Sequence, residues 1–288
     1  MRRIHLKAMS LIAFGILFCT FGCASVKFRD LSFLPDHLKK QNKEPKLNVF
    51  MPKDASAKNF PVLIFIHGGN WNRGDKDIYV LMGRNFAKKG VVAVIPDYTL
   101  SPDANYDRMA REVAAAIEWT KQNITKYKGD PDRVFLSGHS AGGHLAALAV
   151  MNPKYGIRES TIRGLVLNDA AGLDIKQHLE QFPPGKKYSY SNTWTNDPEN
   201  WKDASPIYFL NSKTPPIYMY TGRKTFDMIE LGNDRFLQEL HKVQPGAVRQ
   251  FNNKNHFSMI IQYFFSGSNR FEEMLDFMKK IVGSRPYR

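Results

Sequence analysis

Ser140 lies in the sequence Gly138-His139-Ser140-Ala141-Gly142, whose G-x-S-x-G spacing can hold a serine nucleophile in a sharp turn. A short run that ends in apolar residues, 132–136, precedes it, and an Ala- and Leu-rich stretch, 143–150, follows it. Strand, motif and helix in this order expose the serine, and the helix N-terminus faces the charge that develops during attack. The sequence therefore predicts Ser140 as a nucleophile.

A second motif follows a continuous apolar run at residues 62–66, which reads as a buried strand. The run ends in His67-Gly68-Gly69-Asn70-Trp71. A glycine pair can bring bare backbone N–H groups close to a ligand, because no Cβ obstructs the approach. This loop is therefore a candidate binding element for the same reaction.

The two motifs, in this order and at this separation, resemble the α/β-hydrolase superfamily, specifically the esterase/lipase branch with an HGG loop. They are most similar to small carboxylesterases and kynurenine-formamidase-like hydrolases, and the similarity covers residues 46–282. The resemblance implies a mainly parallel central sheet flanked by helices. It also implies an oxyanion hole in which the N–H of Ala141 works with an N–H of Gly68 or Gly69.

A serine nucleophile needs a histidine base, and the resemblance implies the chain order serine, acid, histidine. Three histidines follow the stretch after Ser140. His178 lies in an irregular segment and His241 in a helical pattern, whereas His256 lies in a polar loop just after a strand candidate at 248–251. We therefore predict His256 as the base.

The acid is where the sequence departs from the family. Relatives place Asp or Glu about three residues beyond the glycine that ends the penultimate strand, and from Gly222 that position is Thr225. Asp227 follows shortly after, and an earlier strand end offers Asp174 and Asp169. Chain position favours Asp227 as the acid, then Asp174, which could instead cap a helix, and then Asp169.

Apolar runs and helical patterns alternate along the chain, which predicts a single α/β domain with a mainly parallel sheet. Met109, Val113 and Ile117, for example, share one face of a predicted helix. The strand candidates are residues 47–52, 61–66, 91–96, 133–136, 162–167, 216–221 and 248–251. The hydrolase domain is predicted over residues 46–288.

Residues 175–214 interrupt this alternation and contain several aromatic side chains, Trp194 and Trp201 among them. Related hydrolases insert a cap at this place. The segment is interpreted either as a cap whose aromatic residues line the substrate pocket or as an ordinary surface excursion.

The N-terminus has the outline of an export signal over residues 1–22, with a basic start and an apolar stretch too short to span a bilayer. Gly22-Cys23 resembles a bacterial lipobox, which predicts lipidation of Cys23, with ordinary cleavage after Ala24 as the alternative. Residues 23–45 are expected to form a tether or surface arm. The protein is accordingly expected in the bacterial cell envelope or periplasm.

Composition limits the remaining classes of function. Both cysteines, Cys19 and Cys23, fall in the signal region, so no cysteine nucleophile or cysteine zinc site is available in the domain. No pair of histidines has convincing metal spacing, and no metal or cofactor is expected. The net charge of +14 favours anionic surfaces, but the basic residues are scattered without a nucleic-acid motif.

These features together predict hydrolysis of small carboxylic esters through an acyl-enzyme on Ser140. An amide or formamide hydrolase would use the same site. A catalytically silent protein that binds an envelope ligand is a third reading, since Thr225 stands where relatives have the acid and the chain is basic. The oligomeric state is not determined by the sequence.

Overall fold

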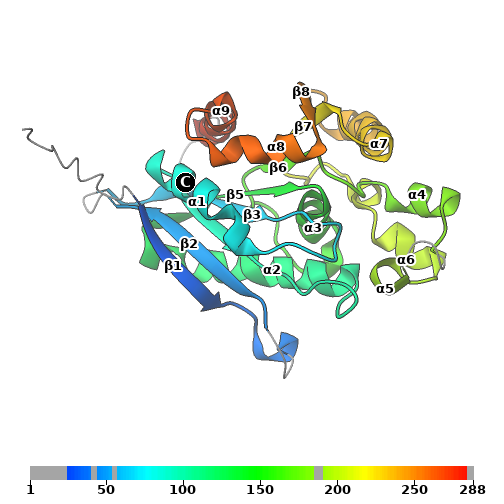
Figure 1. Ribbon diagram of the computed structural model, residues 1–288, viewed down its shortest axis with the longest axis horizontal. Coiled ribbons are helices and arrows are strands. Elements are labelled where there is room, and N and C mark those ends of the chain that lie inside the picture. The colour runs from blue at the N-terminus through cyan, green and yellow to red at the C-terminus, as the bar shows by residue number, and fades with distance from the viewer. Residues whose placement is uncertain (1–24, 40–43, 54–56, 185–190, 284–288) are drawn as a thin grey trace, which may run out of the picture.

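The computed structural model describes residues 25–39, 44–53, 57–184 and 191–283 (Figure 1). In these residues eight strands form one sheet in the order β1-β2-β4-β3-β5-β6-β7-β8. β1 and β2 pair antiparallel, as do β2 and β4, and every other neighbouring pair is parallel. The strands are β1 Ser25–Ser32, β2 Lys46–Pro52, β3 Phe60–Ile66, β4 Val92–Pro96, β5 Gly129–His139, β6 Leu165–Asn168, β7 Ile217–Lys224 and β8 Val248–Asn255. The predicted α/β fold with a mainly parallel sheet is confirmed.

Helices cover both faces of the sheet, which is why the central strands are continuous apolar runs rather than alternating ones. Side chains of α2, α3 and α7 pack in the core on one face, and those of α1 and α9 pack in the core on the other. The longer helices are α1 Val80–Lys88, α2 Tyr106–Asn123, α3 Ala141–Met151, α7 Asp227–Val243 and α9 Asn269–Gly283.

Helix α2 shows how local sequence sets these elements. Asn105 caps its N-terminus by accepting a hydrogen bond from the Arg108 N–H at 3.0 Å. Met109, Val113 and Ile117 are buried, as their helical spacing predicts. The helix therefore packs its apolar face on the sheet and α3.

The first described residues form strand β1, within the stretch 23–45 predicted as a tether or surface arm. β1 pairs with β2 from Ser25 opposite Pro52 to Ser32 opposite Lys46. Phe28 contacts Tyr127 at a ring distance of 4.8 Å, and Lys27 pairs with Asp77. Charged residues on an edge strand hide the strand pattern. The predicted export signal and Cys23 lie outside the described residues.

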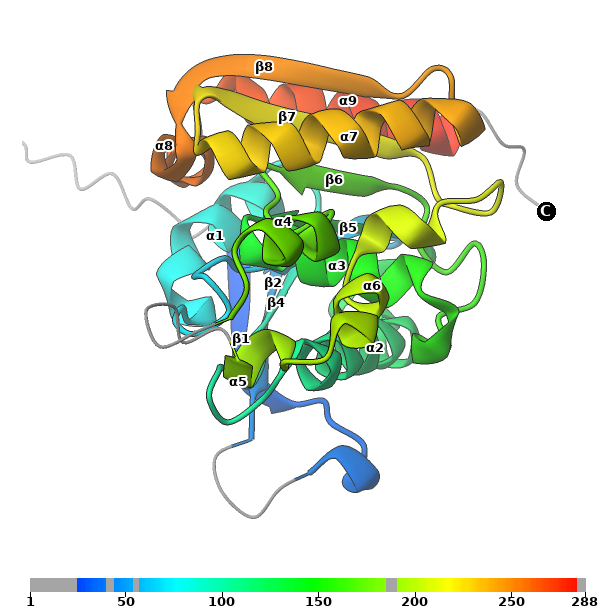
Figure 2. The ribbon, with the colours of Figure 1, turned by 90° about the vertical axis from the view of Figure 1, so that its right-hand side faces the viewer.

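Three short helices follow β6 in the region predicted as a cap, and they gather at one end of the molecule (Figures 1 and 2). They are α4 Ile175–Gln181, α5 Ser191–Trp194 and α6 Pro198–Asp203. Trp194 and Trp201 are both buried, and the Trp194 ring lies 4.6 Å from that of Trp71. This segment is therefore packed onto the HGG loop.

None of the helices in the described part of the chain is long and apolar enough to cross a membrane.

Candidate active site

Ser140 occupies a strained turn between β5 and α3. Its φ of 53° and ψ of −123° lie in a region that residues other than glycine rarely adopt. A Cβ on Gly142 would lie 2.1 Å from the Ile66 carbonyl oxygen, so only glycine lets the start of α3 approach the end of β3. The turn has the geometry that the G-x-S-x-G spacing predicts.

A continuous hydrogen-bonded series joins Ser140, His256 and Asp169. The Oγ of Ser140 lies 2.9 Å from Nε2 of His256, and Nδ1 of His256 lies 2.6 Å from Oδ2 of Asp169. All three side chains are buried. A serine hydroxyl, an imidazole and a carboxylate in this sequence can remove the hydroxyl proton and stabilise the resulting imidazolium.

The sheet topology explains how these residues meet. Ser140 follows β5, Asp169 follows β6, and His256 begins the short helix α8 His256–Ile261 directly after β8. These strands are parallel, so their carboxyl ends share one edge of the sheet, where α/β proteins build their sites.

Asp169 is held by donors from the neighbouring strand β7. Its Oδ1 accepts from the Gly222 N–H at 2.9 Å, and its Oδ2 accepts from the Thr225 hydroxyl at 2.6 Å. Its own N–H donates to the Tyr220 carbonyl at 2.7 Å. These bonds fix the carboxylate against His256. Thr225 stands at the family's usual acid position. Here its hydroxyl supports the carboxylate of Asp169, which follows another strand, and sequence reasoning missed this contact.

The structure does not bring Asp227 or Asp174 to His256, and the preference for Asp227 is corrected accordingly. Asp227 is exposed and begins α7. Asp174 caps α4 through the Gln177 N–H and pairs with Arg235 at 2.7 Å. Chain position did not identify the acid, because the ends of β6 and β7 are distant in the sequence but lie side by side in the sheet.

The HGG loop passes over the nucleophile. A Cβ on Gly68 would stand 3.2 Å from the Ser140 Cβ. Burial raises the pKa of Tyr79 to about 12, and a backbone hydrogen bond with Gly68 opposes this rise. The N–H of Ala141 at the start of α3 and that of Gly68 or Gly69 remain the candidate oxyanion donors.

His139 lies between the HGG loop and the catalytic histidine. Its Nε2 is 3.0 Å from the His256 carbonyl oxygen, and the two rings are 4.6 Å apart. Burial, and then the nearby His256, lower the pKa of His139 to about 3. The imidazole is therefore neutral at physiological pH and donates through Nε2, which positions the backbone of His256.

His144, on α3, links two loops around the site. Its Nδ1 accepts from the indole N–H of Trp71 at 3.1 Å, and its Nε2 donates to the Ala204 carbonyl at 2.7 Å. Burial lowers the pKa of His144 to about 4. The histidine thus connects the HGG loop to the residue that follows α6, and it does so in the neutral form.

His144 is expected to make the fold sensitive to acid. An unfolded histidine takes up its proton near pH 6.5 and folded His144 only near pH 4, so the unfolded state binds more protons between these values. The free energy of unfolding should fall as the pH is lowered through this window, by about 2 kcal/mol at pH 5 from this residue alone. Urea unfolding at pH 7 and pH 5 tests this. An equal pH dependence in wild type and His144→Gln would contradict it.

The other histidine candidates lie elsewhere. His178 lies on α4 beside Phe182, and His241 lies exposed on α7, where Nε2 contacts the Ala247 carbonyl oxygen at 3.1 Å. The histidine that contacts the Ser140 Oγ is His256. Within the described residues, no group of three or more His, Cys, Asp or Glu side chains could hold a metal ion.

This combination of sheet topology, serine turn and hydrogen-bonded side chains is that of an α/β-hydrolase. The chain belongs to the BD-FAE family, whose model matches residues 47–229. The resemblance predicted from the two glycine-containing motifs is confirmed at the level of the superfamily and its HGG-type esterases.

Known esterases are among its relatives. Esterase LipC of Mycobacterium tuberculosis is 30% identical over 192 residues, which cover 62% of this chain and 47% of LipC. The chain thus spans about half the length of this relative. The solved structure of phosphonate-inhibited esterase B from Lactobacillus rhamnosis has a TM-score of 0.73 at 18% identity and covers 91% of this chain and 87% of that one. A truncated carbohydrate esterase from gut microbiota has a TM-score of 0.72 at 20% identity, with coverage of 90% and 97%. These two structures support the fold.

Proposed function

We propose that this protein is a serine hydrolase that cleaves carboxylic esters through an acyl-enzyme on Ser140. The observation that carries the proposal is the series of hydrogen bonds from the Ser140 Oγ through His256 to Asp169. Asp169, rather than Asp227, is proposed as the acid. Relatives named as esterases support the class of substrate.

The proposed reaction has two halves. His256 Nε2 accepts the proton of Ser140 as Oγ attacks the ester carbonyl carbon, and the N–H of Ala141 with that of Gly68 or Gly69 stabilises the oxyanion. The intermediate collapses, the bond to the alcohol oxygen breaks, and His256 returns the proton to the departing alcohol. Water then attacks the acyl-enzyme by the same route and releases the carboxylic acid. Asp169 holds the imidazole through its contact with Nδ1 of His256.

The test is to combine turnover with covalent trapping. Purified residues 24–288 are assayed with p-nitrophenyl acetate, butyrate and octanoate, and then treated with an alkyl phosphonate ester that carries a leaving group. We expect turnover to stop as one phosphonyl group appears on the peptide that contains Ser140. Turnover that persists after stoichiometric labelling of that peptide would refute the proposed function, as would the absence of turnover with every ester.

We also propose that the protein is exported to the cell envelope and held there by lipid on Cys23. Support comes from the basic, apolar and small-residue sections of the first 23 residues, which precede β1. The mass of the mature N-terminal peptide, purified from a bacterial host, distinguishes a lipidated Cys23 from cleavage after Ala24.

A further inference from the structure

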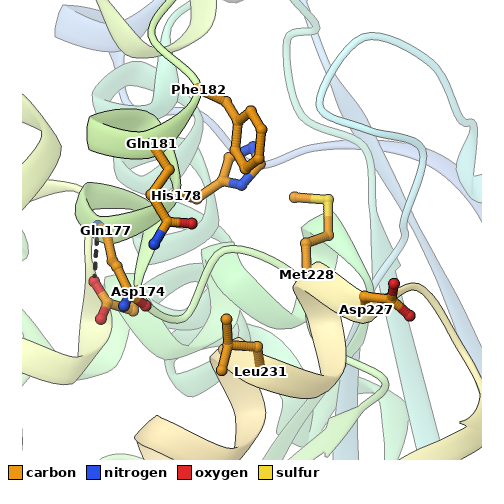
Figure 3. Close-up of a pocket in the computed structure, with 9 residues that line it drawn as sticks. Asp174, Gln177, His178, Gln181, Phe182, Asp227, Met228 and Leu231 are labelled. Atoms are coloured by element: carbon orange, nitrogen blue, oxygen red, sulfur yellow. Dashed lines mark hydrogen bonds between the residues drawn. The ribbon is translucent and has the colours of Figure 1, made fainter.

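A pocket of about 500 Å³ lies between α4 and α7, outside the hydrogen-bonded series described above. Figure 3 shows the α4 side chains on one side and those of α7 on the other, with Met228 and Leu231 projecting from α7 toward α4. The residues that line it are Asp174, Gln177, His178, Gln181, Phe182, Asp227, Met228, Leu231 and Gly232.

One wall of the pocket follows directly in the chain from residues that contact Asp169 and His256. Thr225, which donates to Asp169, and Phe226, whose ring lies 5.2 Å from that of His256, directly precede the pocket residues Asp227 and Met228. One short stretch of chain therefore supports the acid, contacts the base and forms a wall of the pocket. A substrate group that extends from a carbonyl at Ser140 past Phe226 would enter it.

Apolar side chains in the pocket are exposed to an unusual degree. Phe182 is 55% exposed, Met228 42% and Leu231 49%, and Phe226, which precedes Asp227 in the chain, is 52% exposed. Single exposed apolar residues are common, but three that line one pocket are typical of a binding surface. Covering them would be favourable by roughly 25 cal/mol for each Å² of apolar surface removed from water.

The charge of the lining argues against an anionic occupant. The chain carries a net charge of +14, yet none of the described residues that line this pocket is Lys or Arg. Arg235 compensates the buried carboxylate of Asp174, whereas Asp227 remains exposed. Burial lowers the pKa of His178, so this ring adds no positive charge at neutral pH. Among the described residues of the lining, Asp227 is therefore the exposed charge that a carboxylate or phosphate on the substrate would meet.

We infer that the pocket between α4 and α7 is a subsite for an uncharged apolar chain or ring of the ester, and that it gives the enzyme a preference for such esters over short or anionic ones. The inference rests on the proposed function. The apolar group can belong to the acyl side or to the alcohol side of the ester, and the experiment separates the two.

The first arm fills the pocket. Leu231→Trp is compared with wild type on p-nitrophenyl acetate, p-nitrophenyl octanoate and octyl acetate. For each enzyme, kcat/KM with p-nitrophenyl octanoate and with octyl acetate is divided by kcat/KM with p-nitrophenyl acetate. We expect one of these two ratios to be at least tenfold lower in Leu231→Trp than in wild type. A fall for octanoate assigns the pocket to the acyl side, and a fall for octyl acetate assigns it to the alcohol side. Gln238→Trp, at an exposed α7 position outside the lining, is the matched control and should leave both ratios unchanged.

The second arm tests the charge. Wild type should hydrolyse the carboxylate-bearing analogue of the octyl substrate that responds in the first arm at least tenfold less efficiently than that substrate. The analogue is a p-nitrophenyl octanedioate monoester for the acyl side and 8-acetoxyoctanoate for the alcohol side. Asp227→Lys should reduce the difference in kcat/KM between the anionic ester and the uncharged one. Met228→Glu supplies a second variant of the apolar wall, and its octanoate or octyl acetate ratio should fall as in Leu231→Trp.

The outcomes separate this inference from the proposed function. Unchanged ratios in both Leu231→Trp and Met228→Glu, with acetate still cleaved by wild type, would overturn the subsite and leave the esterase proposal intact. No discrimination against the anionic ester would overturn the charge preference. Absence of acetate hydrolysis in wild type would refute the proposed function and the subsite with it.

Discussion

Replacing Ser140 by alanine is expected to lower kcat for p-nitrophenyl acetate by about 10⁶-fold, because the nucleophile and the acyl-enzyme are both lost. The change removes one hydroxyl whose Oγ lies 2.9 Å from His256 Nε2 and leaves the strained turn in place. Steady-state kinetics, with circular dichroism to verify the fold, provide the measurement.

The residual rate is itself informative. The candidate oxyanion donors at Ala141 and at Gly68 or Gly69 remain in Ser140→Ala, so some rate above that of water should survive. Ser212→Ala, at an exposed serine in a loop, is the matched control and should retain full activity. A Ser140→Ala enzyme within tenfold of wild type would show that another group forms the covalent intermediate or that none forms.

Asp169→Asn is expected to lower kcat by about 10⁴-fold with little change in KM. The amide keeps one oxygen, which can accept from the Gly222 N–H, and its NH2 group then lies beside Thr225 and His256. It no longer stabilises the imidazolium and can favour the wrong tautomer of His256. Asp227→Asn should lower kcat less than tenfold, because Asp227 is exposed at the start of α7 and the carboxylate bonded to His256 is that of Asp169. The opposite ranking of the two variants would restore Asp227 as the acid.

A second substitution tests the position of the carboxylate more directly. The Thr225 hydroxyl lies 2.6 Å from the same Asp169 oxygen that bonds to His256. A carboxylate at residue 225 can therefore reach the imidazole. The double variant Asp169→Asn with Thr225→Asp should recover at least tenfold of the lost kcat, whereas Thr225→Asn in the same background should recover none.

Much of the fold could be predicted because the buried central strands are continuous apolar runs in the sequence. The apolar runs at 62–66 and 92–96 are buried on both faces and can be recognised without tertiary information. β1 was missed because its stability comes from pairing with β2 and from contacts such as Lys27 with Asp77. Such contacts leave no periodic pattern in an edge strand.

The candidate site was predictable in part for a related reason. Ser140 lies in a local motif, and His256 follows the last strand, so both could be placed from the sequence. The acid depends on which strand ends lie side by side, and the chain shows only that Asp169 and Thr225 each follow a strand. Their hydrogen bond exists because β6 and β7 are neighbours in the sheet, which no short segment specifies.

The triad residues are also far apart along the chain, and this separation ties activity to folding. His256 contacts Ser140 across 116 residues and Asp169 across 87 residues. Contacts of such long range form late and slowly, because the intervening chain must first lose its freedom. A refolding protein regains its activity only when β8 has joined β7. Recovery of ester hydrolysis therefore reports completion of the sheet, and a chain that ends before β8 would have no base to deprotonate Ser140.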